Sequence, residues 1–494
     1  MCNWASILKT VKVKINLSFV CFLALLFTYL LSQLPFLTSD AALNIAGGSR
    51  GAWTDEGLYT CQIRNFIHHG RFDILDGDAF LKSPLLSFSV FPFFKIFGTS
   101  LSTARLIAIF FSLSLLLIFL KNRLTLIVGS CFIVSTLMLF PIHQYGHLCL
   151  AEIFSSLLVV VSILVLTLPR SNKKYVPLIV SHFLLLLAVL FKIQYIYLLI
   201  LPLLLKTTLY LFNRSIENRN QFLIACILTI IILVGMFSLW YLPFRETWEQ
   251  LANFQSGRIS LDSLSLGLIW WNIKVNLLTS RYILFTLTFI ISVISALYNI
   301  SRNLYSKEIK TLLVISFLWF TIELHKLCMV YLPVRYLISF YMSMGIFIAV
   351  VMGFNITQTR SKVKSISLIC LISIFLLNIY HYQEAYSQRT FVVQKINTYF
   401  KKLTKKDDVV IGPWAPSFNW ESQCYAYPIW NEFLGNRNIK TYYKPDYIVS
   451  EYNQEDSDSA YKKNNIVLDD YADSITQIKV ALWKLNFYRV KKTK

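Results

Sequence analysis

Apolar stretches of about 20 residues recur along most of the chain, with short polar joints between them. A helix needs about 20 consecutive apolar residues to cross the hydrocarbon core of a bilayer. The stretches that meet this rule lie at 17–37, 101–120, 124–141, 148–168, 175–191, 193–211, 221–243, 282–300, 311–331, 336–355 and 365–381. The pattern predicts an all-α polytopic membrane protein with about eleven transmembrane helices.

The basic residues between these stretches predict the orientation of the chain. Lys and Arg collect in alternate joints, such as 121–123 and 302–310, whereas the joint at 141–147 has none. Cytoplasmic loops carry an excess of Lys and Arg, so we expect a multi-pass protein of the cell membrane with a cytoplasmic N-terminus. The first apolar stretch is too long for a cleaved signal peptide. An odd number of spans then places the C-terminal residues outside.

Composition supports the membrane assignment. The chain has 494 residues, is 56% hydrophobic and carries a net charge of +21. A soluble domain has too little interior for this apolar content. Because the cations lie in the joints between apolar stretches, the charge indicates contact with membrane lipids and not with nucleic acid.

The longer polar segments predict the domain organisation. Residues 1–381 form the predicted transmembrane domain, interrupted by outer loops at 38–100 and 244–281. From residue 382 to 494 the composition becomes mixed polar, with short β-prone runs such as Val409–Ile411 between Gly and Pro residues. Such alternation predicts a small extracytoplasmic α/β domain.

An acidic pair in the first outer loop is the leading candidate for chemistry. Asp55 and Glu56 follow the first span, with Tyr59 close by. A carboxylate there can act as a general base toward an acceptor hydroxyl or amine; a solvated loop pair is the alternative interpretation. Lys82 precedes Ser83-Pro84, where proline favours an extended chain. We interpret Lys82 as a phosphate ligand or, alternatively, as a lysine that snorkels to the interface.

Further charged residues occur at predicted outer ends of spans. Glu152 and Lys192 lie in otherwise apolar surroundings, and Arg335-Tyr336 begins the tenth span. Ionisable groups at membrane depth are costly and tend to be functional, and the guanidinium fork suits phosphate oxygens. Structural ion pairing is the alternative for each of these groups.

Metal binding is only weakly indicated. His143 and His147 have the i, i+4 spacing of two metal ligands on a helix, but a clear third ligand is absent from the sequence around them. No cofactor is certain from the sequence, and a divalent metal ion held by the outer carboxylates stays possible.

The order of the motifs resembles one enzyme family. The segments that carry the resemblance are Asp55-Glu56, Gly70-Arg71-Phe72, Lys82-Ser83-Pro84-Leu85, Phe97-Gly98, Ala104-Arg105-Leu106, Glu152, Lys192 and Arg335-Tyr336. They are similar to those of bacterial relatives of the protein O-mannosyltransferases and of the aminoarabinose transferase that modifies lipid A. Those are GT-C fold glycosyltransferases that use polyprenyl-phosphate sugars. The match departs from the lipid A branch at Leu58 and at Lys-Ser-Pro, where that branch has Arg and Lys-Pro-Pro.

The resemblance implies roles for the candidate residues. Asp55 would activate or orient the acceptor with support from Glu56, and Tyr59 and Tyr336 would position the donor. The cations at positions 82 and 335 would stabilise the departing polyprenyl phosphate. We therefore expect an integral-membrane glycosyltransferase that moves a sugar from a polyprenyl-phosphate donor to an extracytoplasmic lipid, glycan or protein acceptor with inversion. The alternatives are an oligosaccharide ligase or polymerase, a transporter or flippase of lipid-linked sugars, and a non-catalytic sensor or assembly subunit.

Overall fold

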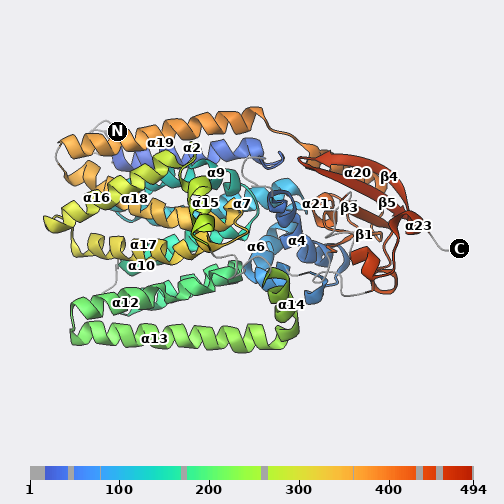
Figure 1. The fold of residues 1–494 in the computed structure, drawn as a ribbon, viewed down its shortest axis with the longest axis horizontal. Coiled ribbons are helices and arrows are strands. Elements are labelled where there is room, and N and C mark those ends of the chain that lie inside the picture. The colour runs from blue at the N-terminus through green and yellow to red at the C-terminus, as the bar shows by residue number, and fades with distance from the viewer. Residues whose placement is uncertain are drawn as a thin grey trace, which may run out of the picture.

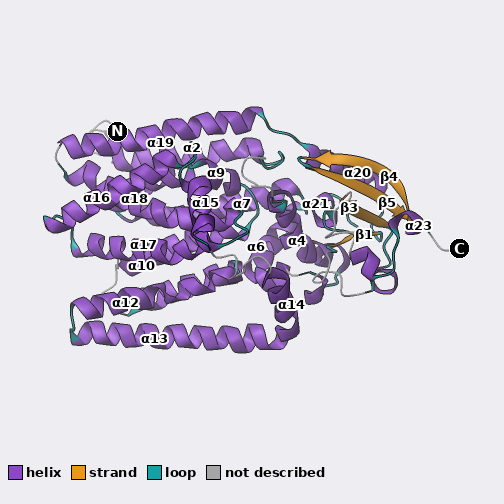
Figure 2. Cartoon of the chain, in the orientation of Figure 1, coloured by secondary structure: helices purple, strands orange, loops and turns teal. Residues whose placement is uncertain are grey.

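The chain forms a long helical bundle with a small mixed α/β domain at one end (Figures 1 and 2). The computed structural model describes residues 17–42, 49–77, 79–167, 175–256, 265–359, 361–429, 438–451 and 460–491. The bundle helices are α2 (Leu17–Gln33), α7 (Leu101–Leu116), α8 (Arg123–Phe132), α10 (Ala151–Thr167), α11 (Val176–Phe191), α12 (Leu201–Phe212), α13 (Ile216–Met236), α16 (Ile283–Ser301), α17 (Lys307–Glu323), α18 (Ile338–Gln358) and α19 (Ser361–Ser387).

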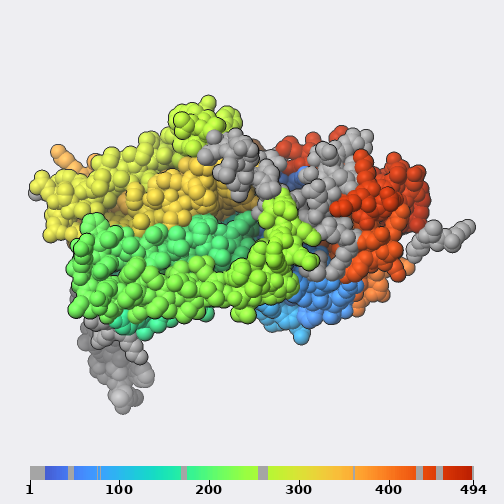
Figure 3. Space-filling model, turned by 60° about the horizontal axis from the view of Figure 1, so that its bottom comes forward, coloured from blue at the N-terminus to red at the C-terminus, as the bar shows by residue number. Residues whose placement is uncertain are grey.

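Each predicted apolar stretch coincides with one of these helices. Within the described ranges, eight helices, some extended by adjoining turns, are long and apolar enough to cross a membrane. Helices α10 and α11 are apolar but shorter. The protein is therefore a multi-pass membrane protein, as predicted. Its central helix is α18, whose apolar window is fully buried, whereas α13 forms a flank of the bundle (Figures 1 and 3).

The span predicted over 124–141 is bent near its end. The chain turns by 94° between the segment Arg123–Leu137 and helix α9 (Phe140–Gly146). Pro141 occupies the first turn of α9, where its missing N–H costs nothing, but it could not continue the preceding helix. After this turn, α9 contacts α7, α10, α19 and η10.

The segment predicted to be the first outer loop is largely helical. The acidic pair lies inside α4 (Gly51–His69), which is followed by α5 (Ala79–Lys82) and α6 (Pro84–Phe97). The prediction of an extended stretch around Lys82 is wrong: Lys82 ends α5, Pro84 begins α6, and only Ser83, with φ −148° and ψ 57°, separates the two helices. The second outer segment contains α14 (Arg245–Ser256) and α15 (Leu266–Leu277).

Short helical turns complete the bundle and its connections. They are η1 (Leu34–Phe36), η2 (Ile74–Asp76), η3 (Leu117–Lys121), η4 (Ile133–Leu137), η5 (Ile193–Ile200), η6 (Phe237–Tyr241), η7 (Leu242–Phe244), η9 (Leu324–Cys328) and η10 (Val334–Leu337). Of these, η10 carries Arg335, one of the predicted site residues.

The C-terminal domain is built on a five-stranded sheet of order β2-β1-β3-β5-β4. Its elements are α20 (Val392–Leu403), β1 (Val409–Ile411), α21 (Ala415–Phe418), β2 (Tyr425–Tyr427), η11 (Ile439–Tyr443), β3 (Tyr447–Glu451), α23 (Leu468–Tyr471), β4 (Ala472–Val480) and β5 (Trp483–Val490). Strands β2, β1 and β3 are parallel, and β5 pairs antiparallel with β3 and β4. Side chains alternate between faces: Val410 and Phe487 join the core of the bundle, while Ile411 and Tyr488 form a separate cluster.

Candidate active site

Four charged side chains meet at the end of the bundle that faces the sheet. Asp55 comes from α4, Glu152 from the first turn of α10, Lys192 from the junction of α11 and η5, and Arg335 from η10. All four are buried. The structure thus brings together residues that are up to 280 positions apart in the sequence (335 − 55).

The four groups form an alternating chain of charge. Arg335 Nη2 lies 3.3 Å from Asp55 Oδ2, Arg335 Nε lies 4.0 Å from Glu152 Oε1, and Lys192 Nζ lies 3.1 Å from the same oxygen. Two acids and two bases balance each other, which makes their burial tolerable. An additional anion that enters the cluster would have to draw one of the cations away from its carboxylate.

Two tyrosines border the cluster. Lys192 donates a hydrogen bond to the Tyr59 hydroxyl, and its Nζ lies 4.5 Å from the ring centroid. Burial raises the pKa of the Tyr59 phenol above its ordinary value, so the hydroxyl remains a hydrogen-bond donor at neutral pH. The half-buried Tyr336 has its ring centroid 5.2 Å from the Arg335 guanidinium carbon.

Some polar atoms of the cluster lack hydrogen bonds. Arg335 Nε and Glu152 Oε2 are buried and make no hydrogen bond with the described residues, whereas Glu152 Oε1 is paired with Lys192. Buried polar atoms without partners are rare and commonly indicate a bound water, ion or ligand. The cluster therefore has spare bonding capacity for a polar ligand.

The start of α4 is shaped around Arg335. A Cβ atom placed on Gly51 would lie 1.4 Å from Arg335 Nη1, so only glycine leaves room for the guanidinium. Arg335 Nη1 also donates to Ser49 Oγ at 3.1 Å, and the Tyr331 hydroxyl donates to the same oxygen at 2.6 Å. Neither Gly51 nor Ser49 had any signal in the sequence, because a close approach is a property of the folded chain.

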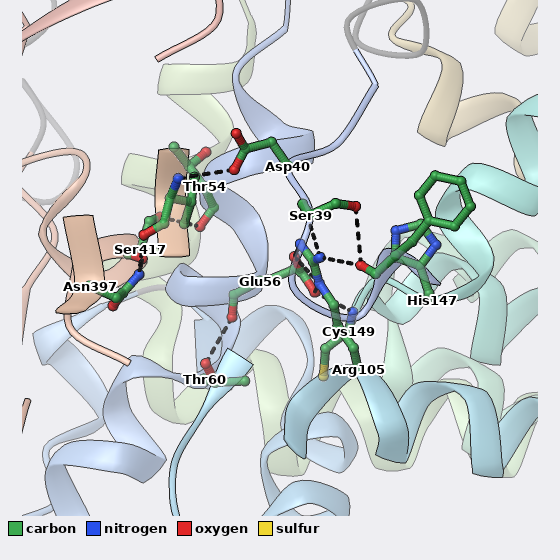
Figure 4. A network of polar contacts seen from close by, with 12 residues as sticks. Ser39, Asp40, Thr54, Glu56, Thr60, Arg105, His147, Cys149, Asn397 and Ser417 are labelled. Atoms are coloured by element: carbon green, nitrogen blue, oxygen red, sulfur yellow. Dashed lines mark hydrogen bonds and ion pairs between the residues drawn. The ribbon is translucent and has the colours of Figure 1, made fainter. Parts of the chain in front are cut away.

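Glu56 belongs to a separate polar network that includes Arg105 and Cys149 (Figure 4). Its carboxylate pairs with Arg105 Nη2 at 2.7 Å and accepts a hydrogen bond from the Cys149 backbone at 2.8 Å. Arg105 also donates to the carbonyl oxygens of Phe36 and Ser39, at 2.8 and 2.6 Å. These bonds join α4 to α7, to the end of α2 and to the chain before α10. Arg105 was part of a recognised motif, but the sequence did not indicate this role.

The C-terminal domain holds α4 from the other side. The Arg64 guanidinium donates to the carbonyl oxygens of Gly57, Pro416 and Asn419 at 2.9, 2.7 and 2.9 Å, and lies 4.1 Å from the Trp420 ring centroid. The backbones meet closely, because a Cβ atom on Gly57 would lie 2.7 Å from Pro416 backbone atoms. The position of Asp55 therefore depends on the C-terminal domain.

The other residues singled out in the sequence lie on α5 and α9. Lys82 is half-buried at the end of α5. His143 bonds to Ser32 at 2.8 Å, and His147 bonds to Gln33 at 3.1 Å. Within the described residues there is no group of three His, Cys, Asp or Glu side chains suited to a metal ion.

Solved structures with the same architecture define the fold. ArnT from Cupriavidus metallidurans bound to undecaprenyl phosphate matches with a TM-score of 0.59 and 12% identity, covering 95% of this chain and 97% of that one. The Archaeoglobus fulgidus oligosaccharyltransferase in complex with zinc and sulfate matches with a TM-score of 0.52 and 13% identity, covering 86% and 68%. No protein-family model and no curated protein matches the sequence.

These matches extend along nearly the whole chain, so the similarity includes the bundle and the C-terminal domain. The protein has the GT-C fold of membrane glycosyltransferases, as the motif order predicted.

Proposed function

We propose that the protein is a membrane glycosyltransferase that transfers a sugar from a polyprenyl-phosphate carrier to an extracytoplasmic acceptor, with inversion. The observation that carries the proposal is the buried chain Asp55–Arg335–Glu152–Lys192 at one end of the bundle, with polar atoms left unbonded. The GT-C fold supports it, and so do the undecaprenyl phosphate and dolichol phosphate bound by two proteins of similar fold.

Asp55 serves the acceptor in this proposal. Its carboxylate accepts the proton of the acceptor hydroxyl or amine while the acceptor atom bonds to the anomeric carbon. The bond from that carbon to the phosphate oxygen breaks at the same time, and its electron pair leaves with the phosphate. Attack from the face opposite the leaving phosphate inverts the anomeric centre.

The cations serve the departing phosphate. Arg335 exchanges part of its contact with Asp55, 3.3 Å away, for the phosphate oxygens, and its fork suits their geometry. Lys82 supplies a second positive charge from the outer segment. Stabilising charge that develops on a leaving group is commonly the largest catalytic contribution.

The other predicted residues position these groups. Glu152 and Lys192 hold Arg335 and Tyr59 in place through the contacts described above. Tyr59 and Tyr336 border the donor site as hydroxyl and ring contacts. Glu56 supports Asp55 indirectly, by fixing α4 through Arg105.

The distribution of charge supports an extracytoplasmic site. The α12–α13 and α16–α17 joints lie at the end of the bundle away from the sheet (Figure 1). Both joints are basic, at 214–219 and 302–310, and basic joints face the cytoplasm. We therefore assign the cluster and the C-terminal domain to the opposite, extracytoplasmic side.

The direct test is transfer of label by purified protein in lipid nanodiscs. Polyprenyl-phosphate donors with radiolabelled sugars and a bacterial envelope extract are supplied to wild type, to Asp55→Asn and to Glu246→Gln. Glu246 is a matched control because it is an exposed acid on outer helix α14. We expect label on an acceptor from wild type and from the control, and at least a 100-fold loss for Asp55→Asn.

Two results would contradict parts of this proposal. If labelled donor crosses the bilayer of proteoliposomes without covalent transfer, the protein is a flippase. If Asp55→Asn transfers at the wild-type rate, the assignment of Asp55 is wrong. Adding EDTA decides metal dependence, because an enzyme that uses only Lys82 and Arg335 to neutralise phosphate keeps its rate.

A further inference from the structure

Two cavities follow one another along the seam between α2, α9 and α19. The first, which we call the lower cavity, lies within the bundle, farther from the C-terminal domain, and has a volume of about 390 Å³. It is lined by residues of the 28–32 segment of α2, by His143 of α9 and by residues of the 375–383 segment of α19. The upper cavity, of about 320 Å³, continues the same seam past the helix ends to the C-terminal domain. Figure 1 shows α2 and α19 side by side along the edge of the bundle.

The lower cavity has the character of a lipid groove. Its walls include Leu31 and Ile379, which are both exposed on the membrane-facing surface of the bundle. Polar side chains interrupt the apolar lining at Thr28, Ser32, His143, Asn378, Tyr382 and Gln383, and one of them has a free donor. Asn378 is 4% exposed, its Oδ1 accepts from the Phe140 backbone, and its Nδ2 has no partner in the described part of the chain. An amide donor at this position suits an ester oxygen on an otherwise apolar ligand.

The upper cavity joins the bundle to the C-terminal domain and has a positive lining. Among the described residues of its lining, Asp40 is the only acid. Three donors already satisfy that carboxylate: the Thr390 hydroxyl and the backbone N–H groups of residues 392 and 393, at 2.6, 2.8 and 3.0 Å. Arg389 and Lys479 are the cations of the lining. The cavity therefore favours an anion.

Arg389 is held in place with one donor group left over. Its Nε and Nη1 donate to the carbonyl oxygens of Tyr386 and Pro35, both at 2.8 Å. Its guanidinium carbon lies 3.6 Å from the Tyr386 ring centroid. Within the described residues, Nη2 has no protein partner. A fixed guanidinium with a spare N–H edge is suited to a phosphate oxygen.

The β4–β5 hairpin adds a second cation beside Lys479. Lys479 and Lys484 are directly opposite each other in the ladder, so both side chains leave the same face of the hairpin. Both are exposed, and neither has an acidic partner among the described residues. Like charges at opposed positions destabilise a strand pair, and an anion bound between hairpin and bundle would relieve the repulsion.

We propose that this seam binds an anionic phospholipid of the membrane. The acyl chains lie in the lower groove between α2 and α19, and the phosphate is held in the upper cavity by Arg389, Lys479 and Lys484. The lipid thereby ties the β4–β5 hairpin of the C-terminal domain to the bundle. The site lies on the α2–α19 edge, apart from Lys82 in the α5–α6 segment, and the inference does not depend on the proposed transferase function.

Photolabelling tests the site without any measurement of activity. The probe is phosphatidylglycerol with a diazirine in its acyl chain, added to protein in phosphatidylcholine nanodiscs, with labelled peptides mapped by mass spectrometry. We expect label on peptides 17–36 and 361–389, and competition by unlabelled phosphatidylglycerol but not by phosphatidylcholine. The double variant Lys479→Glu/Lys484→Glu should lose about 10-fold or more of the label, since each basic residue contributes several-fold to binding of anionic lipid.

The controls match the charge change and the fold. The double variant Lys401→Glu/Lys402→Glu makes the same charge change at the far end of α20 and should keep wild-type labelling. If the hairpin variant does not fold, Ile379→Trp tests the groove instead, because the indole fills it and should remove the label from α2. Equal labelling by a phosphatidylcholine probe, or equal loss in both double variants, would overturn the proposal. Asp55→Asn should label like wild type, which separates this site from the transferase assignment.

Discussion

Replacing Gly51 with alanine should inactivate the site without unfolding the protein. The new Cβ atom would lie 1.4 Å from Arg335 Nη1, whereas non-bonded atoms approach to about 3.5 Å. The guanidinium must therefore move by roughly 2 Å. A shift of that size away from α4 takes its Nη2 beyond ion-pair distance of Asp55, which is 3.3 Å away in the native site.

The expected loss of activity in Gly51→Ala follows from the sensitivity of catalysis to the position of the catalytic groups. A misplacement of about 1 Å can lower a rate about 100-fold, so Gly51→Ala should reduce kcat/KM at least 100-fold, which is about 2.7 kcal/mol of transition-state stabilisation. The unfolding free energy should fall, because the displaced guanidinium leaves the buried Asp55 carboxylate without its ion-pair partner. Alanine offsets up to about 1 kcal/mol of this loss as a better helix former than glycine. The clash itself is relieved by moving the end of a flexible side chain, so the protein should still fold.

The assay measures transfer kinetics and the thermal unfolding midpoint of the same preparations in nanodiscs. Gly235→Ala is the matched control, because nothing lies within 4 Å of a Cβ atom at that position of α13. It should keep wild-type kinetics. A Gly51→Ala protein with wild-type kcat/KM would show that the placement of Arg335 against Asp55 does not matter for the reaction.

Three further perturbations test the contacts around α4. Lys192→Met removes the cation that lies 3.1 Å from buried Glu152 and should lower the unfolding free energy by about 3–5 kcal/mol. Adding Glu152→Gln to the same chain should restore most of this loss. Tryptophan fluorescence during denaturation in detergent measures the unfolding free energy of both variants. Gly57→Ala places a Cβ atom 2.7 Å from the Pro416 backbone, so hydrogen exchange of residues 412–424 should rise while that of the bundle stays unchanged. Burial lowers the pKa of His68 from 6.5 to about 4, so the folded state favours the neutral ring. The stability linked to the neutral ring is complete above pH 6.5 and is lost as the pH falls toward 4. In His68→Gln, the thermal unfolding midpoint should therefore depend less on pH between 6.5 and 4 than in wild type.

The apolar stretches could be predicted because their signal is local. A helix that crosses a bilayer must satisfy its own backbone hydrogen bonds and present about 20 apolar residues, and both requirements can be read from a continuous stretch of sequence. The chain turn within 124–141 escaped this reasoning. Hydropathy alone does not register the 94° change of direction before α9, although Pro141 marked the place.

The site could be predicted only as a set of candidates. Asp55, Glu152, Lys192 and Arg335 stood out because charged residues near apolar stretches are rare. Their contacts were not predictable, since the four come from separate helices and meet only when those helices pack. Adjacent residues do not share partners either, so the ion pair of one did not predict that of the other: Asp55 pairs with Arg335, while its neighbour Glu56 pairs with Arg105.

The sequence by itself determined that this is a helical membrane protein with a small β-containing C-terminal domain. It also identified the charged residues that meet in the candidate site. Each of those conclusions depends on the composition or order of neighbouring residues. Only the tertiary structure decided which acid meets which base, why Gly51 must lack a side chain, and that the C-terminal domain holds α4 through Arg64. Those features depend on distances between atoms far apart in the chain, and packing sets such distances once the helices have formed.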